Sequence, residues 1–201
     1  NNAAFTTNAA LSAGTLTWTP TASDAGRTYP VTFVGANVLP TLFTTQIRVD
    51  RYPVVTAPAT AAATEGQTVA VTVTTSDPDA DPLTVLTVDV AGLPPGNNAT
   101  FTTTPDKTSG TLTWTPGFDD SRAAPYTVTF TGGNTLTRSR SVAISVANVD
   151  RAPSITAPPL VTGFENAPVQ VQVTAADPDG DAITSLTADL SGLPAGSNAA
   201  F

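Results

Sequence analysis

The sequence contains no cysteine and no histidine among its 201 residues. Without cysteine, the chain can form neither disulfides nor thiolate metal sites. Without histidine, it lacks the commonest transition-metal ligand and the commonest general base of enzymes. Charged residues make up only 12% of the chain, and the net charge of −8 argues against nucleic acid or an anionic membrane surface as a partner.

Long apolar runs and helical periodicity are missing as well. No segment has the length and apolar character of a membrane span, and no window spaces apolar residues as an amphipathic helix does. Instead, residues 69–73, 111–115 and 126–130 alternate in character and are rich in β-branched or aromatic side chains. This alternation predicts β-strands, and the hydrophobic fraction of 40% is enough for a packed core.

The chain repeats itself at the spacing of a domain. Residues 14–20, Gly-Thr-Leu-Thr-Trp-Thr-Pro, return unchanged as residues 110–116, and Asp-Pro-Asp at 77–79 returns at 177–179. The segments Val-Asp-Arg-Tyr-Pro and Val-Asp-Arg-Ala-Pro predict linkers, because proline stops a strand ladder. We therefore expect the C-terminal half of a repeat at 1–52, a complete repeat at 53–152 and an N-terminal half at 153–201.

The complete repeat predicts an all-β fold. Further strands are expected at 83–90 and 138–146, and about seven short strands in roughly 100 residues are typical of a Greek-key β-sandwich. Period-2 alternation places Trp114 on the same face as Leu112, and Trp18 on the same face as Leu16. Both tryptophans are therefore expected in the core, although an exposed tryptophan could instead stack on a sugar.

The acidic loop at Asp77, Asp79 and Asp81 is the first candidate site. Carboxylates this close repel one another unless a cation lies between them, and Ca²⁺ takes 6–8 oxygen ligands. A solvated acidic turn is the alternative. An EF-hand is excluded, because its sixth position would be Pro82 or Ala182 where glycine is needed.

An immunoglobulin-like strand order would bring acids from neighbouring repeats together at each linker. The first junction would collect Asp24, Asp50, Asp77, Asp79 and Asp81. The second would collect Glu65, Asp119 or Asp120, Asn148, Asp150, Asp177, Asp179 and Asp181. Glu165, the counterpart of Glu65, is a further candidate metal ligand. Sets of oxygen ligands alone suit Ca²⁺ and are poor for zinc or copper.

This layout resembles cadherin-like repeats, with a Glu near the domain start, an Asp-x-Asp loop and an Asp-bearing linker. The motifs Leu-Pro-x-Gly, Gly-Thr-Leu-Thr-Trp-Thr-Pro and Tyr-x-Val-Thr-Phe resemble even more the immunoglobulin- or cadherin-like repeats of large bacterial and archaeal surface proteins. The resemblance covers nearly the whole chain. It implies tandem immunoglobulin/cadherin-like β-sandwich domains on a prokaryotic cell surface, with Ca²⁺ at their junctions and the number of ions left open.

Three functions follow as alternatives. The first is a structural repeat of an extracellular fibre, stalk or adhesin that Ca²⁺ stiffens at the junctions. The others are a carbohydrate-binding accessory module of a secreted enzyme and a metal-free spacer. Catalysis is not expected, since the paired carboxylates lie in loops without a base, nucleophile or cofactor motif. The expected partners are neighbouring repeats of the same protein, including head-to-tail copies in which one half-repeat completes another.

Overall fold

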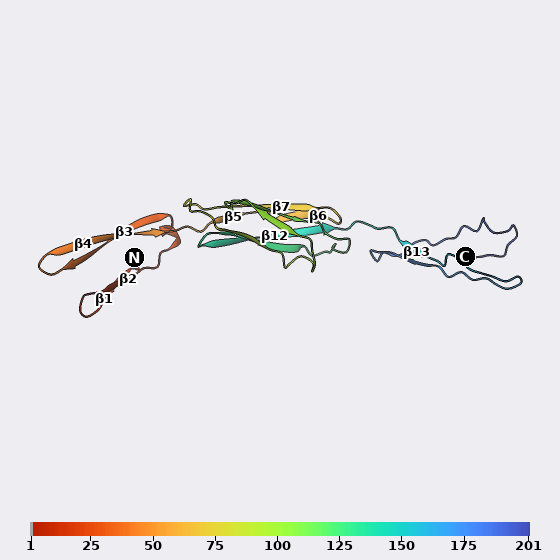
Figure 1. The fold of residues 1–201 in the computed structure, drawn as a ribbon, viewed down its shortest axis with the longest axis horizontal. Coiled ribbons are helices and arrows are strands. Elements are labelled where there is room, and N and C mark those ends of the chain that lie inside the picture. The colour runs from red at the N-terminus through yellow and green to blue at the C-terminus, as the bar shows by residue number, and fades with distance from the viewer. Residues whose placement is uncertain (1) are drawn as a thin grey trace.

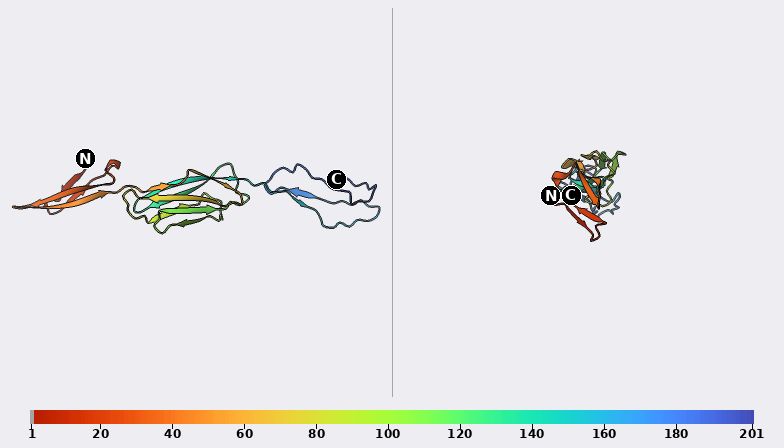
Figure 2. Two further views of the ribbon diagram at one scale, coloured as in Figure 1. Left: turned by 90° about the horizontal axis from the view of Figure 1, so that it is seen from above. Right: turned by 90° about the vertical axis from the view of Figure 1, so that its left-hand side faces the viewer.

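The computed structural model describes residues 2–201, and within them the only helix is a 3-10 turn at Ala22–Asp24. The other elements are β-strands that form three units in a row, with the chain ends in the outer units (Figures 1 and 2). The predicted all-β fold is confirmed. No helix in this part of the chain is long and apolar enough to cross a membrane.

The central unit is a sandwich of two four-stranded sheets, with strand orders β5-β7-β10-β9 and β6-β12-β11-β8. The strands are β5 (Val54–Thr56), β6 (Thr60–Thr64), β7 (Val69–Ser76), β8 (Val85–Asp89), β9 (Thr100–Thr103), β10 (Ser109–Trp114), β11 (Tyr126–Gly133) and β12 (Thr137–Ala147). Strand β7 pairs with β10 and β8 with β11, so the chain crosses between the sheets in Greek-key fashion. The strand count exceeds the expected seven because Pro58 separates β5 from β6, which joins the opposite sheet.

The core of this sandwich follows from the alternation in its strands. Leu112 and Trp114 are each only 1% exposed, and Phe130 and Ile144 are fully buried on the facing sheet. The Trp114 ring meets the edge of Tyr126 with 5.2 Å between centroids, a favourable aromatic geometry. The predicted core positions of Leu112 and Trp114 are confirmed, and Trp114 is therefore unable to serve as a stacking surface for a sugar.

The outer units reproduce parts of the central one. The first contains β1 (Ala4–Thr7), β2 (Gly14–Thr17), β3 (Arg27–Ala36) and β4 (Pro40–Val49), and the last contains β13 (Ser154–Thr156) and β14 (Thr174–Ala176). Strands β1 and β2 pair Phe5 with Leu16 as β9 and β10 pair Phe101 with Leu112. Strands β13 and β14 likewise keep the register of β5 and β7. The sequence repeat is thus also a repeat of strand pairing.

Candidate functional site: the junctions between repeats

The acidic loop of each junction follows the strand that ends at residue 76 or 176. The Asp77 Oδ1 atom accepts hydrogen bonds from the backbone N–H groups of Asp79 (2.8 Å) and Asp81 (3.3 Å). Asp177 makes the same two bonds in the next repeat, at the same distances. The other oxygen of Asp77 accepts a bond from Asn134 Nδ2. The first carboxylate of each loop therefore holds the loop in shape.

At the second junction, the Arg151 side chain joins two repeats. Its guanidinium donates to Asp119 Oδ1 (2.9 Å) and to the Phe118 carbonyl (3.3 Å), both in the loop before β11. On the other side, its Nε donates to Asp179 Oδ1 (2.8 Å) and its Nη2 donates to the Pro178 carbonyl (2.9 Å). The backbone N–H of Arg151 also donates to Asp179 Oδ2. One side chain thus contacts the last loop of one repeat and the acidic loop of the next.

Arg51 occupies the same place at the first junction. Its backbone N–H donates to Asp79 Oδ2 at 2.7 Å, and its Nη1 donates to the Pro78 carbonyl at 3.4 Å. Its guanidinium lies over Gly26, where an added Cβ would overlap it. We call the contacts of Arg51 and Arg151 with the loops on either side the arginine clasps.

The clasps change the electrostatics of the aspartates that they hold. The Arg151 side-chain hydrogen bond keeps the pKa of Asp179 below its ordinary value of 3.8, against the opposing effect of desolvation. The backbone N–H of Arg51 does the same for the pKa of Asp79. Asp179 in turn raises the pKa of Arg151. Arginine side chains of the chain itself therefore supply part of the positive charge that offsets the repulsion between the carboxylates.

Glu65 stabilises the second junction from inside the sandwich. It is only 1% exposed, and its two carboxylate oxygens accept hydrogen bonds from the backbone N–H groups of Ser121 (2.8 Å) and Val149 (2.9 Å). These bonds attach the loop before β11 and the start of the linker to the same side chain. Because both oxygens accept backbone donors, Glu65 acts here as a structural anchor.

Asp24 and Asp120 fold the loops in which they lie. Asp24 Oδ2 accepts from the backbone N–H of Thr21 at 2.8 Å, a bond that lowers the pKa of Asp24. Asp120 Oδ2 accepts from the backbone N–H of Gly117 at 2.7 Å. Each carboxylate therefore accepts a backbone hydrogen bond from its own loop.

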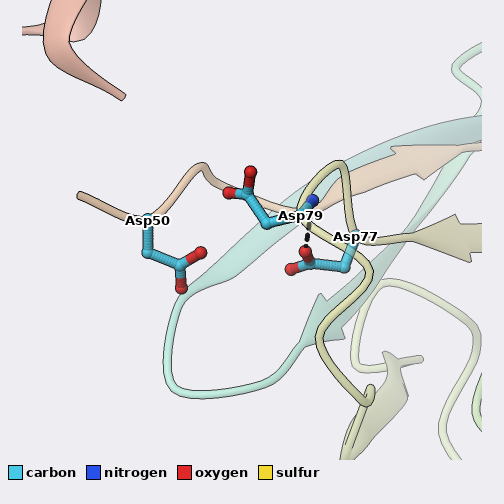
Figure 3. Close-up of side chains that lie close together, drawn as sticks. All are labelled: Asp50, Asp77 and Asp79. Atoms are coloured by element: carbon cyan, nitrogen blue, oxygen red, sulfur yellow. Dashed lines mark hydrogen bonds between the residues drawn. The ribbon is translucent and has the colours of Figure 1, made fainter. Parts of the chain in front are cut away.

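A compact group of acids lies at the first junction. Oxygens of Asp50, Asp77 and Asp79 lie within 4.8 Å of one another, the only such group among residues 2–201. Figure 3 shows Asp50 reaching from the linker toward the loop that carries the other two. Arg48 lies beside them and binds Asp50 (3.1 Å) and Asp81. The donor set fits a hard cation such as Ca²⁺, although Arg48 and Arg51 compete for its oxygens.

The remaining candidates lie apart from such a group. Asp150, Asn148 and Glu165 are exposed and make no hydrogen bond or ion pair among the residues that the structure describes. Asp181 donates its backbone N–H to Asp177, while its own carboxylate faces solvent. The second junction therefore contains the arginine clasp and the Glu65 anchor in place of a compact acidic group.

The central unit is the part of the chain that matches a known protein family. Residues 50–145 match the model of a family described as bacterial Ig domain. The segment between the two linkers is therefore similar to bacterial immunoglobulin-like domains. This confirms the immunoglobulin-like part of the resemblance, and the match begins at the linker aspartate Asp50. No curated protein matches the chain.

Several solved structures resemble this chain distantly. The I67–I69 fragment of the titin I-band is 12% identical over 87% of this chain and 60% of its own, with a TM-score of 0.49. Titin domains A168–A170 are 15% identical over 70% of this chain and 48% of their own, with a TM-score of 0.40. The SrpA adhesin of Streptococcus sanguinis is 17% identical over 53% of this chain and 65% of its own, with a TM-score of 0.39. In each case, the match spans less than two thirds of the other protein.

The arginines of the clasps are junction residues that the sequence pattern did not predict. Arg51 and Arg151 both stand directly after the linker aspartate, in the repeated run Val-Asp-Arg. The chain has only 8 basic residues, so an arginine at equivalent positions of both linkers is a signal. This repeated arginine predicts a positively charged side chain, rather than a metal ion, as a partner of the acidic loops.

Proposed function

We propose that this chain is a structural, non-catalytic segment of a prokaryotic cell-surface stalk, fibre or adhesin. In this role, Ig-like repeats act as spacers, and their junctions keep neighbouring repeats aligned. The family match of residues 50–145 supports the surface role. The buried Trp114 leaves the central domain without that residue as a sugar-stacking platform, so a structural role is favoured over carbohydrate binding.

The observation that carries this proposal is the recurrence of the arginine clasp at both junctions. Both arginines donate hydrogen bonds to the Asp-Pro-Asp loop after the linker. In the loop before it, Arg151 bonds to the Phe118 carbonyl and Arg51 packs over Gly26. Asp179 is only 6% exposed and Arg151 28% exposed, so this pair is better shielded from solvent than an ordinary surface pair. Contacts on both sides of a linker remove rotational freedom between the domains, which is what a stiff spacer requires.

Small-angle X-ray scattering tests the spacer role directly. At concentrations where the chain is monomeric, we expect the wild type to give one extended shape. The double variant Arg51→Ala/Arg151→Ala should give a broader distance distribution with a lower mean end-to-end length. Arg140→Ala removes one positive charge from the exposed face of β12, away from the linkers, and serves as the control. A wild-type distribution as broad as that of the double variant would reject the spacer role.

A calcium ion at the first junction is a second element of the proposal. Asp50, Asp77 and Asp79 would hold it, since they supply oxygens from both sides of the junction. The ion would add positive charge between carboxylates that otherwise repel one another. It would supplement the Arg51 clasp and further restrict movement at that linker.

Thermal melting with Ca²⁺ and with a chelator tests this element. A ligand that binds only the folded state raises stability, by about 2.7 kcal/mol at one hundred times its Kd. We expect Ca²⁺ to raise the Tm of the wild type and of Asp150→Asn, whose carboxylate has no partner at the second junction. Asp50→Asn should lose most of the effect. If Ca²⁺ and chelator give the same wild-type Tm, the calcium site is wrong and the clasps act alone.

A further inference from the structure

The loops that precede the two linkers differ in composition. Asp24 and Asp120 occupy equivalent places in them, because each accepts the backbone N–H of the residue three positions earlier and the carbonyl of each accepts a tyrosine hydroxyl. The two residues just before these aspartates are Ala-Ser at 22–23 and Phe-Asp at 118–119. The loop before the second linker therefore carries an aromatic ring and a carboxylate that the loop before the first linker lacks at these positions.

Both residues of the second loop contact the guanidinium of Arg151. Asp119 Oδ1 accepts a hydrogen bond from Arg151 Nη2 at 2.9 Å, and the Phe118 carbonyl accepts one from the same atom at 3.3 Å. The guanidinium carbon lies 5.5 Å from the centroid of the Phe118 ring, within the range of a cation–π contact. The loop thus binds the arginine through a charge, a carbonyl and a ring.

The Phe118 ring is held by the central domain. A Cβ added at Gly66 would lie 3.3 Å from the tip of this ring, and Gly66 has a φ of +72°, a conformation that favours glycine. Glu65, the preceding residue, accepts the backbone N–H of Val149 just before the linker. The surface that Arg151 contacts is therefore attached to the sandwich rather than to a free loop.

Arg51 has no comparable support in the loop before the first linker. Among residues 2–201, its hydrogen bonds go to Asp79 and Pro78, which both lie after the linker. The Ser23 hydroxyl pairs instead with the Thr21 hydroxyl of its own loop, at 2.8 Å. Hydrogen bonds therefore hold the first clasp on one side of its linker and the second clasp on both sides.

The ion pair of Arg48 with Asp81 crosses the first junction as well. These side chains are 49% and 30% exposed, and an isolated, solvent-accessible pair contributes little because ordering two flexible side chains costs entropy. Arg151 is ordered at once by a ring, two carbonyls and two aspartates, so each further contact costs less entropy. The Arg48 pair is therefore a weaker restraint than the second clasp.

We propose, on the basis of the clasp role proposed above, that Phe118 and Asp119 make the second junction stiffer than the first. The repeats on either side of the second linker then move as one body, because Arg151 is bonded to both of them. The first linker acts as the hinge of the array. Two residues in the loop before a linker thus set the stiffness of that junction.

Spin labels measure the two junctions separately, because the chain has no native cysteine. Gln46→Cys with Thr56→Cys spans the first linker. Ala143→Cys with Thr156→Cys spans the second at equivalent strand positions. With a chelator present, so that no calcium ion contributes, double electron–electron resonance should give a distance distribution about twice as wide across the first linker as across the second.

Two exchanges test the residues themselves. Phe118→Ala/Asp119→Ser gives the second loop the residues of the first, and it should widen the second distribution about twofold. Ser23→Asp gives Arg51 a carboxylate in the loop before its linker and should narrow the first distribution, a gain that misfolding would not produce. Asp106→Ser removes an exposed carboxylate from the turn between β9 and β10, and it should leave both distributions unchanged.

The widths also separate the unequal stiffness from the spacer role. A first distribution as narrow as the second would overturn the unequal stiffness and leave both clasps as spacers. Two broad wild-type distributions would overturn the spacer role as well. A second distribution that stays narrow in Phe118→Ala/Asp119→Ser would overturn the assignment of stiffness to these two residues.

Discussion

A single carboxylate can act as a ligand, a cap or an anchor, and its neighbours decide which. Glu65 and Glu165 occupy the same position of the repeat. Glu65 is buried against two backbone N–H donors, whereas Glu165 is exposed. The same residue type at the same repeat position therefore has a structural role only where the rest of the sandwich surrounds it.

The contrast between the two glutamates predicts that a Glu→Gln substitution destabilises the protein at one position and not at the other. Glu65→Gln should destabilise the central domain by about 1–3 kcal/mol, because the amide offers one acceptor where the carboxylate offers two charged ones. Glu165→Gln should leave the stability of the central domain unchanged. Urea denaturation followed by Trp114 fluorescence in a Trp18→Phe background measures both. Equal midpoints for the two variants would show that the Glu65 bonds contribute nothing to stability.

The pattern of residues along a strand predicts which apolar side chains are buried better than it predicts what an acidic side chain binds. Alternation placed Leu112 and Trp114 in the core, because burial depends mainly on which face of a strand a side chain occupies. The sequence pattern predicts Asp24 and Asp120 as cation ligands but does not predict the backbone hydrogen bonds that each accepts from its own loop. A carboxylate's role depends on where nearby backbone N–H groups point, and loop geometry determines that direction.

At the scale of elements, the turn after β8 depends on a close approach of two segments. A Cβ added at Gly92 would overlap the carbonyl oxygen of Thr127 in β11. At its counterpart Gly192, nothing lies within 4 Å of such an atom. In the complete domain, the glycine before the Leu-Pro turn is therefore required because the turn lies directly against β11. No such contact exists at Gly192.

Gly92→Ala should therefore destabilise the central domain by about 1–3 kcal/mol, the usual cost of overpacking. Gly192→Ala, which adds the same methyl group in open space, should change stability by less than about 0.5 kcal/mol. Thermal melting of the whole chain compares the two variants. A Gly92→Ala domain as stable as the wild type would mean that the turn moves away from β11 at no cost.

Strand positions followed from the sequence, whereas the clasps did not. Five strands were expected near 69–73, 83–90, 111–115, 126–130 and 138–146, and β7, β8, β10, β11 and β12 include most of those residues. Arg51 and Arg151 gave no periodic signal, because a long side chain can reach many partners and only tertiary structure selects one. The sequence also predicts larger acidic sets at the junctions than the compact group of Asp50, Asp77 and Asp79, since which acids meet depends on how two domains are oriented at a linker.

At the scale of the whole molecule, the junctions should respond to acid. The pKa values of Asp79 and Asp179 lie below the ordinary 3.8 in the folded chain. Groups with lowered pKa values stabilise the fold above their unfolded values, and this contribution is lost as the pH falls through the folded values. The clasps should thus be intact near neutral pH and open only in acid below pH 3.8, as the pH falls through the lowered folded pKa values and these aspartates become protonated.

Small-angle scattering across about pH 6 to pH 2.5 measures this change. We expect the wild type to lose its single extended shape at the acid end, while circular dichroism still reports β-structure. The Arg51→Ala/Arg151→Ala variant, which has no clasps to lose, should show no such step. A shape that stays constant across this range in the wild type would mean that the ionic contacts do not hold the domains in line.

The identical register of the repeats has a consequence for how such an array changes in length. Every contact of a clasp comes from the linker, the loop before it and the acidic loop after it. A duplication or deletion of one whole repeat would therefore join the same three segments again. Gene rearrangement in steps of a whole repeat can lengthen or shorten the array without any new interface having to evolve.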